Sequence, residues 1–388
     1  MMMKVNGAAV FSVDRFIRDN YSFTVDSSDF SCTSVDGFDI HVIPGFADVH
    51  VHFREPGFSY KETIKTGSMA GARGGYTTVC TMPNLNPTPD NFDNLKVQLD
   101  IINRDAKIKV VPFGSITVGE QGKKLSDLVA MAPYVCGFSD DGRGVDDAGL
   151  MKEAMSIAAS LGKVISAHCE DGTQIKDSPE AEWKEIERDI KLADETGCKF
   201  HVCHISTKES VSLIRDAKKS GVDITCETAP HYLVFSNSDV IDDGRFKMNP
   251  PIRTAVDQKA LVEGVCDGTI DMIATDHAPH SADEKSKGFA GSLNGIVGLE
   301  TAFPVLYTLM CKKGIITIER LVNMMSVAPY KRFGLEPNGY TLIDLGKEFT
   351  VDPDKFMTMG RSSPFTGMSL YGEVLATVID GRAVYFNK

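Results

Sequence analysis

The stretch Val42-Ile43-Pro44-Gly45-Phe46-Ala47-Asp48-Val49-His50-Val51-His52-Phe53 is almost entirely apolar and ends in two histidines separated by a single residue. Its β-branched and aromatic residues predict a strand. Residues two apart on a strand point to the same side of a sheet, so His50 and His52 can both reach one metal ion. An isolated pair of this kind is more often structural, and the rest of the chain has to decide between the two interpretations.

Similar apolar runs recur along the chain and alternate with helical stretches, for example Asp147–Leu161 and Thr207–Ser220, each followed by a glycine. This alternation predicts a parallel sheet with right-handed crossovers. Eight such units indicate a closed (β/α)₈ barrel of the TIM type. An open doubly wound sheet is the alternative, but no GxGxxG motif follows the first run. The predicted strands are Val42–Phe53, Tyr76–Met82, Lys107–Ser115, Tyr134–Ser139, Lys163–His168, Lys199–Ile205, Asp223–Thr228 and Asp271–Thr275.

The two ends of the chain differ from its middle. Residues 1–43 contain short alternating runs such as Tyr21–Val25 and no convincing helix. Residues 340–388 have the same character, and Asp380-Gly381 lies between two of their runs, which is a hairpin signal. We therefore predict a small β subdomain built from both termini, and a barrel domain over residues 44–339.

The composition is that of a globular protein, with 388 residues, 42% of them hydrophobic, and a formal net charge of −12. The acidic balance argues against nucleic acid or an anionic membrane as a main partner. No apolar run is long enough to span a bilayer, and Met1–Arg15 lacks the apolar core of a signal peptide. Nine cysteines without paired spacing fit reduced thiols. These features predict a cytoplasmic protein.

Residues able to bind a divalent metal ion lie at the ends of five predicted strands. In barrels of this type the catalytic groups lie at the C-terminal ends of the strands, where they converge. Imidazole and carboxylate groups together suit zinc and similar ions. Each residue alone has a structural interpretation, but agreement at five strand ends by chance is improbable. The candidates are His50 and His52 (first strand), Asp140 and Asp141 (fourth), His168 (fifth), His201 and His204 (sixth) and Asp276 (eighth).

Not every histidine in these segments can be a ligand. His201 and His204 are three residues apart, so on a strand they face opposite sides. His204 is nearer the C-terminal end and is the better candidate, while His201 is expected to be buried in packing. We interpret His231 and His277 as structural residues or as supports behind the ligands.

Seven stretches extend this pattern: Pro44–Gly57, Gly74–Asn84, Phe200–Glu209, Glu227–His231, Lys247–Pro251, Ala274–His280 and Gly295–Thr301. In this order they resemble the amidohydrolase superfamily and, more narrowly, the dihydroorotase family of the longer bacterial type. The resemblance covers about residues 42 to 335, whereas the terminal β segments match only loosely.

The resemblance implies a metal centre of one or two zinc ions, with two favoured. Many relatives bridge two metals with a carboxylated lysine after the fourth strand, but this chain has no lysine between Lys124 and Lys152. The Asp140-Asp141 pair resembles the branch in which the second aspartate bridges. In that arrangement Asp141 is the bridge and Asp140 a neighbour; His50, His52 and Asp276 hold one ion, and His168 and His204 the other.

The implied reaction is the reversible hydrolysis of (S)-dihydroorotate to N-carbamoyl-L-aspartate in pyrimidine biosynthesis. Zinc lowers the pKa of a bound water from about 15.7 to roughly 7, so a metal-bound hydroxide can attack the cyclic amide carbonyl at neutral pH. The resemblance implies that Asp276 accepts the proton of the hydroxide and delivers it to the departing nitrogen.

Substrate selection is expected to depend on a carboxylate. Arg54 lies two residues beyond His52 and therefore on the same face, and an arginine fork pairs bidentately with a carboxylate. Without the resemblance, Arg54 could equally form a surface salt bridge and Asn84 would be a turn residue. The resemblance places around the substrate His52, Arg54, Asn84, Asn249, His280, Asn294 and Gly295.

Other functions remain open from the sequence. The chain could be another cyclic amidohydrolase, acting on hydantoins or allantoin, although those relatives usually carry the lysine bridge that is missing here. It could be a noncatalytic dihydroorotase-like subunit of an aspartate transcarbamoylase complex, although such subunits are expected to have lost ligands. It could also be an active enzyme that needs this partner to order Ser281–Gly295. The chain could also form a homodimer.

Overall fold

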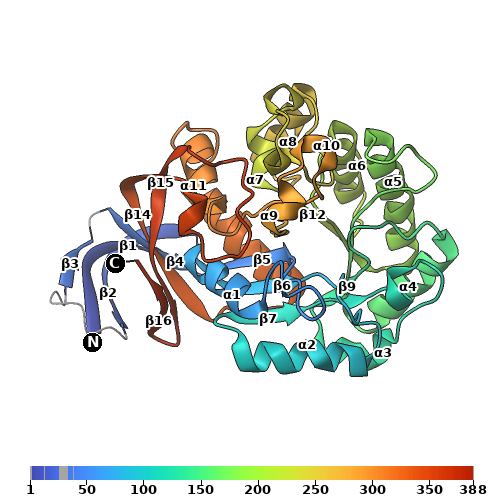
Figure 1. Cartoon of the computed structure of the whole chain (residues 1–388), viewed down its shortest axis with the longest axis horizontal. Helices are drawn as coiled ribbons and strands as arrows, with labels where there is room; N and C mark the ends of the chain where they lie inside the picture. The colour runs from blue at the N-terminus through green and yellow to red at the C-terminus, as the bar shows by residue number, and fades with distance from the viewer. Residues whose placement is uncertain (1, 13, 26–33, 38, 388) are drawn as a thin grey trace.

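A computed structural model describes residues 2–12, 14–25, 34–37 and 39–387. Figure 1 shows a β-sheet containing both chain ends on the left and a larger α/β body on the right. Part of the predicted terminal subdomain, residues 26–33, lies outside the described residues. In the part of the chain that the structure describes, no helix has the length and apolar character needed to cross a lipid bilayer.

The larger body is a barrel of parallel strands. Neighbouring strands pair in the orders β5-β6-β7 and β8-β9-β10-β11-β12-β13. A parallel bridge between Val51 and His277 brings the last strand beside the first, and the His52 amide donates to the His277 carbonyl oxygen at 2.8 Å. The strands are β5 (Phe46–Val51), β6 (Tyr76–Thr81), β7 (Lys109–Pro112), β8 (Gly114–Ser115), β9 (Gly137–Ser139), β10 (Val164–Ala167), β11 (Lys199–Val202), β12 (Ile224–Thr228) and β13 (Met272–Ile273).

The predicted (β/α)₈ fold is confirmed, since β7 and β8 are the two halves of the predicted run Lys107–Ser115 and together form one barrel position. The prediction of a single strand over Val42–Phe53 is wrong. That run contains two strands, β4 (Ile40–Pro44) in the terminal sheet and β5 in the barrel. They separate at Gly45, where a Cβ atom would lie 2.2 Å from side-chain atoms of Thr77.

Helices follow most barrel strands, as Figure 1 shows. The two helical stretches predicted from the sequence are confirmed, and Asp147 and Thr207 act as their N-caps by accepting from backbone amides of the first turn. The α-helices are α1 (Ile64–Arg73), α2 (Phe92–Asp105), α3 (Leu128–Met131), α4 (Ala148–Ser160), α5 (Pro179–Thr196), α6 (Lys208–Lys219), α7 (Pro230–Val234), α8 (Ala255–Asp267), α9 (Ala282–Lys285), α10 (Gly288–Gly291), α11 (Ala302–Leu306), α12 (Ile318–Val322) and α13 (Ala328–Phe333).

Shorter helical turns complete the connections. Two of them are π-helical and continue α11 and α12 without a break. The 3₁₀ turns are η1 (Val118–Glu120), η2 (Ala132–Tyr134), η3 (Asn237–Asp239), η4 (Gly244–Phe246) and η7 (Pro353–Lys355), and the π turns are η5 (Tyr307–Cys311) and η6 (Asn323–Val327).

Within the described residues, both termini contribute to a seven-stranded sheet of order β2-β16-β15-β14-β4-β1-β3. Asp380-Gly381 forms the predicted hairpin between β15 and β16, and both residues have positive φ (50° and 74°), as a tight hairpin turn requires. The division of the chain at residues 43/44 and 339/340 stays a prediction. The strands besides β4 are β1 (Met2–Ser12), β2 (Arg15–Thr24), β3 (Ser34–Asp36), β14 (Gly339–Thr350), β15 (Ser369–Ile379) and β16 (Arg382–Phe386).

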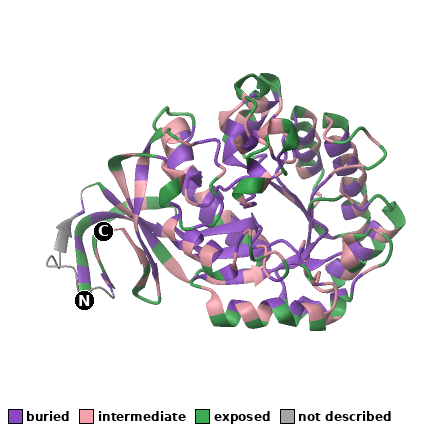
Figure 2. Ribbon diagram, in the orientation of Figure 1, coloured by how far each residue is buried: buried purple, intermediate pink, exposed green. Residues whose placement is uncertain are grey.

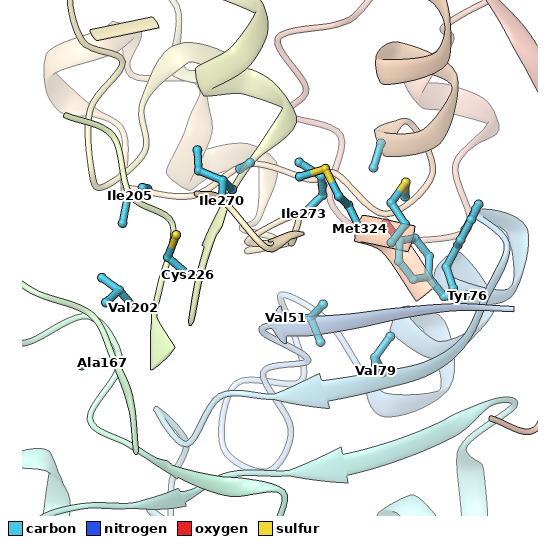
Figure 3. Packing of buried hydrophobic residues seen from close by; sticks show 14 of the residues in the cluster. Val51, Tyr76, Val79, Ala167, Val202, Ile205, Cys226, Ile270, Ile273 and Met324 are labelled. Atoms are coloured by element: carbon cyan, nitrogen blue, oxygen red, sulfur yellow. The ribbon is translucent and has the colours of Figure 1, made fainter. Parts of the chain in front are cut away.

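Buried apolar residues hold the barrel strands in place. Every residue of β5 and β6 is buried, as expected for parallel strands covered on both faces. Figure 2 shows this burial along the strands of the barrel. Figure 3 shows how Val51, Val79 and Val202 belong to one packed cluster with residues of the neighbouring elements. This rigid frame fixes the loops at the strand ends, where the candidate site lies.

Candidate metal and substrate site

The first group of predicted ligands meets at the ends of β5 and β13. His50 Nε2 lies 3.1 Å from Asp141 Oδ1 and 3.7 Å from Asp276 Oδ1. His52 Nε2 lies 3.1 Å from Asp276 Oδ1 and 3.4 Å from Asp141 Oδ2. All four side chains are buried. The structure therefore brings together residues that are more than 200 positions apart in the sequence.

The second group joins the first through Asp141. His168 follows β10 and His204 follows β11, and His168 Nδ1 lies 3.0 Å from His204 Nε2. Asp141 Oδ1 lies 3.7 Å from His204 Nε2 and 3.9 Å from His168 Nδ1. Asp141 is thus the residue that contacts both groups, as a bridging carboxylate would.

The donor set fits a divalent cation. One ligand atom from each of His50, Asp141 and His204 lies within 4.8 Å of the others, and the same holds for His50, His52 and Asp276. His50 Nε2 and Asp141 Oδ1 are buried and lie 3.1 Å apart, yet neither forms a hydrogen bond with any described residue. Buried polar atoms are normally paired, so these two atoms are suited to a metal ion.

The electrostatics of the cluster also favour a positive charge at its centre. Burial alone would lower the pKa of His50, but the Asp141 carboxylate raises it well above the usual value. Burial alone would raise the pKa of Asp141, but His50, His204 and His52 hold it well below its usual range. The same balance lowers the pKa of Asp276 to about 2, with a hydrogen bond from His52 as its largest favourable contribution. Both carboxylates are therefore ionised at neutral pH.

Three of the remaining residues have structural partners. Asp140 accepts hydrogen bonds from the backbone amides of Ile116 at 2.8 Å and Thr117 at 3.0 Å, so it anchors the loop after β8 while Asp141 faces the cluster. His201 is buried in β11 with Nε2 3.1 Å from Glu227 Oε2. His277 Nδ1 accepts from the Gly298 amide at 3.2 Å.

Glu227, at the end of barrel strand β12, is a residue that the sequence interpretation missed. Its side chain is fully buried, and its Oε1 accepts from His50 Nδ1 at 2.9 Å. Its other oxygen contacts His201, and these two imidazoles lower the pKa of Glu227 to about 2 despite burial. The hydrogen bond to Nδ1 leaves His50 Nε2 facing the cluster. Its position near the end of the seventh predicted strand, Asp223–Thr228, could have identified Glu227 as a candidate from the sequence.

A cavity of about 210 Å³ opens beside the ligand cluster. It is lined by all the residues that the resemblance places around the substrate, together with five of the six predicted metal ligands. Three further lining residues were not predicted, and Lys176, an exposed residue after β10, is the only charged one of the three. The lining consists of His52, Arg54, Asn84, Asp141, Gly142, His168, Lys176, His204, Asn249, Asp276, Ala278, His280, Asn294 and Gly295.

Arg54 and Asn84 are in position to recognise an anion. Arg54 Nε donates to the Pro279 carbonyl oxygen at 3.2 Å, and Nη2 lies 3.4 Å from His280 Nε2. Among the described residues no carboxylate forms an ion pair with Arg54, which argues against a surface salt bridge. Asn84 Oδ1 accepts from His52 Nδ1 at 2.9 Å. Asn84 is thus more than a turn residue, because it orients one of the candidate ligands.

A (β/α)₈ barrel whose strand ends carry histidines and carboxylates around a small cavity defines the class of metal-dependent amidohydrolases. The family model described as Dihydro-orotase-like matches residues 40–182. The dihydroorotase of Fusobacterium nucleatum is 45% identical over 97% of this chain and 95% of that protein. The dihydroorotase of Geobacillus thermodenitrificans is 45% identical over 89% of this chain and 87% of that protein. The chain belongs to the dihydroorotase family, and the predicted family is confirmed.

Solved structures agree with this fold. An L-hydantoinase (dihydropyrimidinase) from Arthrobacter aurescens superimposes with a TM-score of 0.85 and 25% identity, covering 98% of this chain and 95% of that one. A dihydropyrimidinase from Brevibacillus agri gives a TM-score of 0.86 at 20% identity, covering 100% and 96%. Since the coverage is nearly complete, both the barrel and the terminal sheet belong to the shared fold.

Proposed function

We propose that this protein is a zinc-dependent dihydroorotase that catalyses the reversible hydrolysis of (S)-dihydroorotate to N-carbamoyl-L-aspartate in pyrimidine biosynthesis. The observation that carries the proposal is the cavity beside the ligand cluster, in which Arg54 lies without a carboxylate partner among the described residues. Dihydroorotate has the two features that such a cavity can bind, a carboxylate and a cyclic amide. The relatives named dihydroorotase support the same substrate.

The family implies a metal, and we propose one or two zinc ions. Nitrogen and oxygen ligands in this combination are typical of zinc. When bound, the ions would polarise the scissile carbonyl and acidify the attacking water. The residues that would hold them are His50, His52 and Asp276 for one ion, His168 and His204 for the other, and Asp141 between the two.

The side chains around the cavity orient the substrate. Arg54 pairs with the substrate carboxylate through its guanidinium fork. Asn84 and His280 complete this carboxylate pocket, while Asn249 and the backbone at Asn294-Gly295 contact the amide groups of the ring. These contacts fix the amide carbonyl next to the ligand cluster, so binding energy lowers the entropic part of the barrier.

Asp276 carries the proton. Water adds to the ring carbonyl, and the proton that it loses passes to the Asp276 carboxylate, which is ionised at neutral pH. The bond between the carbonyl carbon and the ring nitrogen then breaks, and Asp276 returns the proton to that nitrogen. The products are a carboxylic acid, which releases the second proton of the water to solvent at neutral pH, and a neutral carbamoyl nitrogen; the reverse sequence takes that proton up and closes the ring.

Metal analysis tests the centre directly. We expect gently purified protein to contain one or two zinc ions per chain by atomic emission spectroscopy. A chelator should remove the ions and the turnover of dihydroorotate together, and added zinc should restore both. Protein that has no bound divalent ion and gains no activity from zinc would contradict the proposal.

Replacing Arg54 by lysine tests the carboxylate pocket. Lysine keeps the positive charge but loses the bidentate fork. We expect the KM for dihydroorotate to rise about tenfold, the equivalent of about 1.4 kcal/mol of binding, with a smaller change in kcat. Arg104→Lys, at an exposed position on α2, is the matched control. An unchanged KM in Arg54→Lys would contradict this role.

A substrate panel separates the alternatives. We expect turnover of dihydroorotate and far less of hydantoin and allantoin, because Arg54 favours a ring that carries a carboxylate. The likeness to hydantoinases in fold does not identify the substrate, since one fold serves several substrates.

We also propose a cytoplasmic location. Measuring the mass in solution tests for a homodimer, and measuring turnover with and without added aspartate transcarbamoylase tests for a complex with that enzyme.

A further inference from the structure

A buried lysine lies behind the cavity wall. Lys285 is the last residue of α9, and only 9% of its surface is exposed. Its Nζ donates to the carbonyl oxygen of Lys247 at 3.0 Å and to that of Leu293 at 2.8 Å. Among the described residues no carboxylate forms an ion pair with this ammonium group. Its hydrogen bonds therefore go to the backbone of two separate segments.

Both segments lead directly into the cavity wall. Leu293 immediately precedes Asn294 and Gly295, and Lys247 lies two residues before Asn249. The Gly295 amide also donates to the Lys247 carbonyl oxygen at 3.0 Å. Lys285 and this backbone hydrogen bond thus join the two stretches that supply three of the lining residues.

The packing around Lys285 leaves little freedom. A Cβ atom on Gly244 in η4 would lie 2.2 Å from the Lys285 carbonyl oxygen, so the two backbones approach closely. Ser292 Oγ donates to the same carbonyl oxygen at 3.0 Å. Because the backbone of Lys285 is held by these two contacts, its ammonium group can restrict the motion of Leu293 and of the residues that follow it.

The charge of Lys285 is costly where it lies. Burial lowers the pKa of its ammonium group to about 8, with Asp243 as the acidic group that opposes this shift and Lys247 as a second cation. A buried ammonium is destabilising unless it is hydrogen-bonded, and a buried carbonyl that loses its donor is destabilising as well. An apolar side chain would fill the space at a lower cost but would not join the two segments.

We propose that Lys285 is a positioning residue for substrate binding. Its ammonium group holds Lys247 and Leu293 at a fixed separation, so that Asn249 and the backbone at Asn294-Gly295 meet the amide groups of the ring. The proposal rests on the proposed dihydroorotase function for the identity of the ring, and on the contacts of Lys285 alone for the rigidity of the wall.

The experiment compares Lys285→Met with Lys287→Met, a control two residues away whose side chain is exposed. Steady-state kinetics with dihydroorotate, metal content and amide hydrogen exchange are measured for each. In Lys285→Met we expect KM to rise about tenfold because the wall loses both charged hydrogen bonds of the ammonium group. We expect kcat within about threefold of the wild type, unchanged metal content, and faster exchange of the amides in residues 293–295. Lys287→Met should match the wild type.

The outcomes separate the two proposals. An unchanged KM with unchanged exchange would overturn the role of Lys285. A fall in kcat and in metal content together with a rise in KM would also overturn it, since that pattern indicates a general structural role. If Lys285→Met does not fold, Lys285→Gln replaces it. Glutamine retains a donor but neither the charge nor the length of lysine, so KM and the exchange of residues 293–295 should rise by less, and wild-type values of both would overturn the role of Lys285. If the wild type does not turn over dihydroorotate, the proposed function fails, while hydrogen exchange still decides whether Lys285 orders the wall.

Discussion

Asp276→Asn is expected to abolish the turnover of dihydroorotate while the protein stays folded. An asparagine keeps the size of the side chain and can still accept from His52, but it cannot accept and return a proton. General acid–base catalysis contributes about 10²–10⁴-fold to rates, so kcat should fall by at least that amount. The measurement is the steady-state rate in both directions, with thermal unfolding as the check on folding.

The Asp276→Asn variant also loses a charged ligand, so its metal content has to be known. We expect that excess zinc fills the site without restoring turnover, since the proton acceptor is still missing. Asp283→Asn, at an exposed position on α9, is a control that should keep full activity. Residual activity within roughly tenfold of the wild type, a barrier change of only about 1.4 kcal/mol, would refute the role of Asp276.

The barrel could be predicted from the sequence because its parallel strands are buried on both faces. Such strands appear as short continuous apolar runs, and all eight barrel positions fall on such runs. The same property caused the error at Val42–Phe53. Two consecutive strands in different sheets are both buried, and hydrophobicity alone does not show that the chain changes sheet at Gly45.

The candidate ligands could be predicted because a barrel gathers its strand ends on one face. Spacing alone did not decide between Asp140 and Asp141. The reason that Asp141 faces the cluster is that Asp140 is occupied by the backbone of Ile116 and Thr117, which lie on a different strand end. Pairing of this kind depends on three-dimensional neighbours, which a pattern in one segment does not contain.

Residues that support the site from behind were missed for the same reason. Glu227 contacts His50 across 177 positions of sequence, and the Lys285 ammonium group donates to two backbone carbonyl oxygens. Lys176 lies in a loop without regular structure. From the sequence alone, each of the three would be interpreted as an ordinary charged side chain on the surface. The structure shows that Glu227 and Lys285 are buried and that Lys176 lines the cavity.

Glu227→Gln is expected to lower the affinity for zinc by about 10–100-fold, the usual effect of removing a carboxylate that orients a ligating histidine. In the wild type, the Glu227 carboxylate accepts hydrogen bonds from both His50 and His201. The amide nitrogen of glutamine cannot accept, so one of the two imidazoles must turn or lose its partner. The dissociation constant for zinc is measured by competition with a chelator of known affinity. Glu263→Gln, at an exposed position on α8, is the matched control.

A second variant shows whether the effect passes through His50. His201→Gln removes one donor to Glu227 but leaves the contact between Glu227 and His50, so zinc affinity should fall less than in Glu227→Gln. Equal losses in the two variants would mean that burial of the whole network matters, rather than the orientation of His50. If zinc affinity in Glu227→Gln stays within about threefold of the wild type, Glu227 does not orient the ligand, because carboxylates with that role have the larger effect. The buried charge would then serve only to pair with His201 in the barrel core.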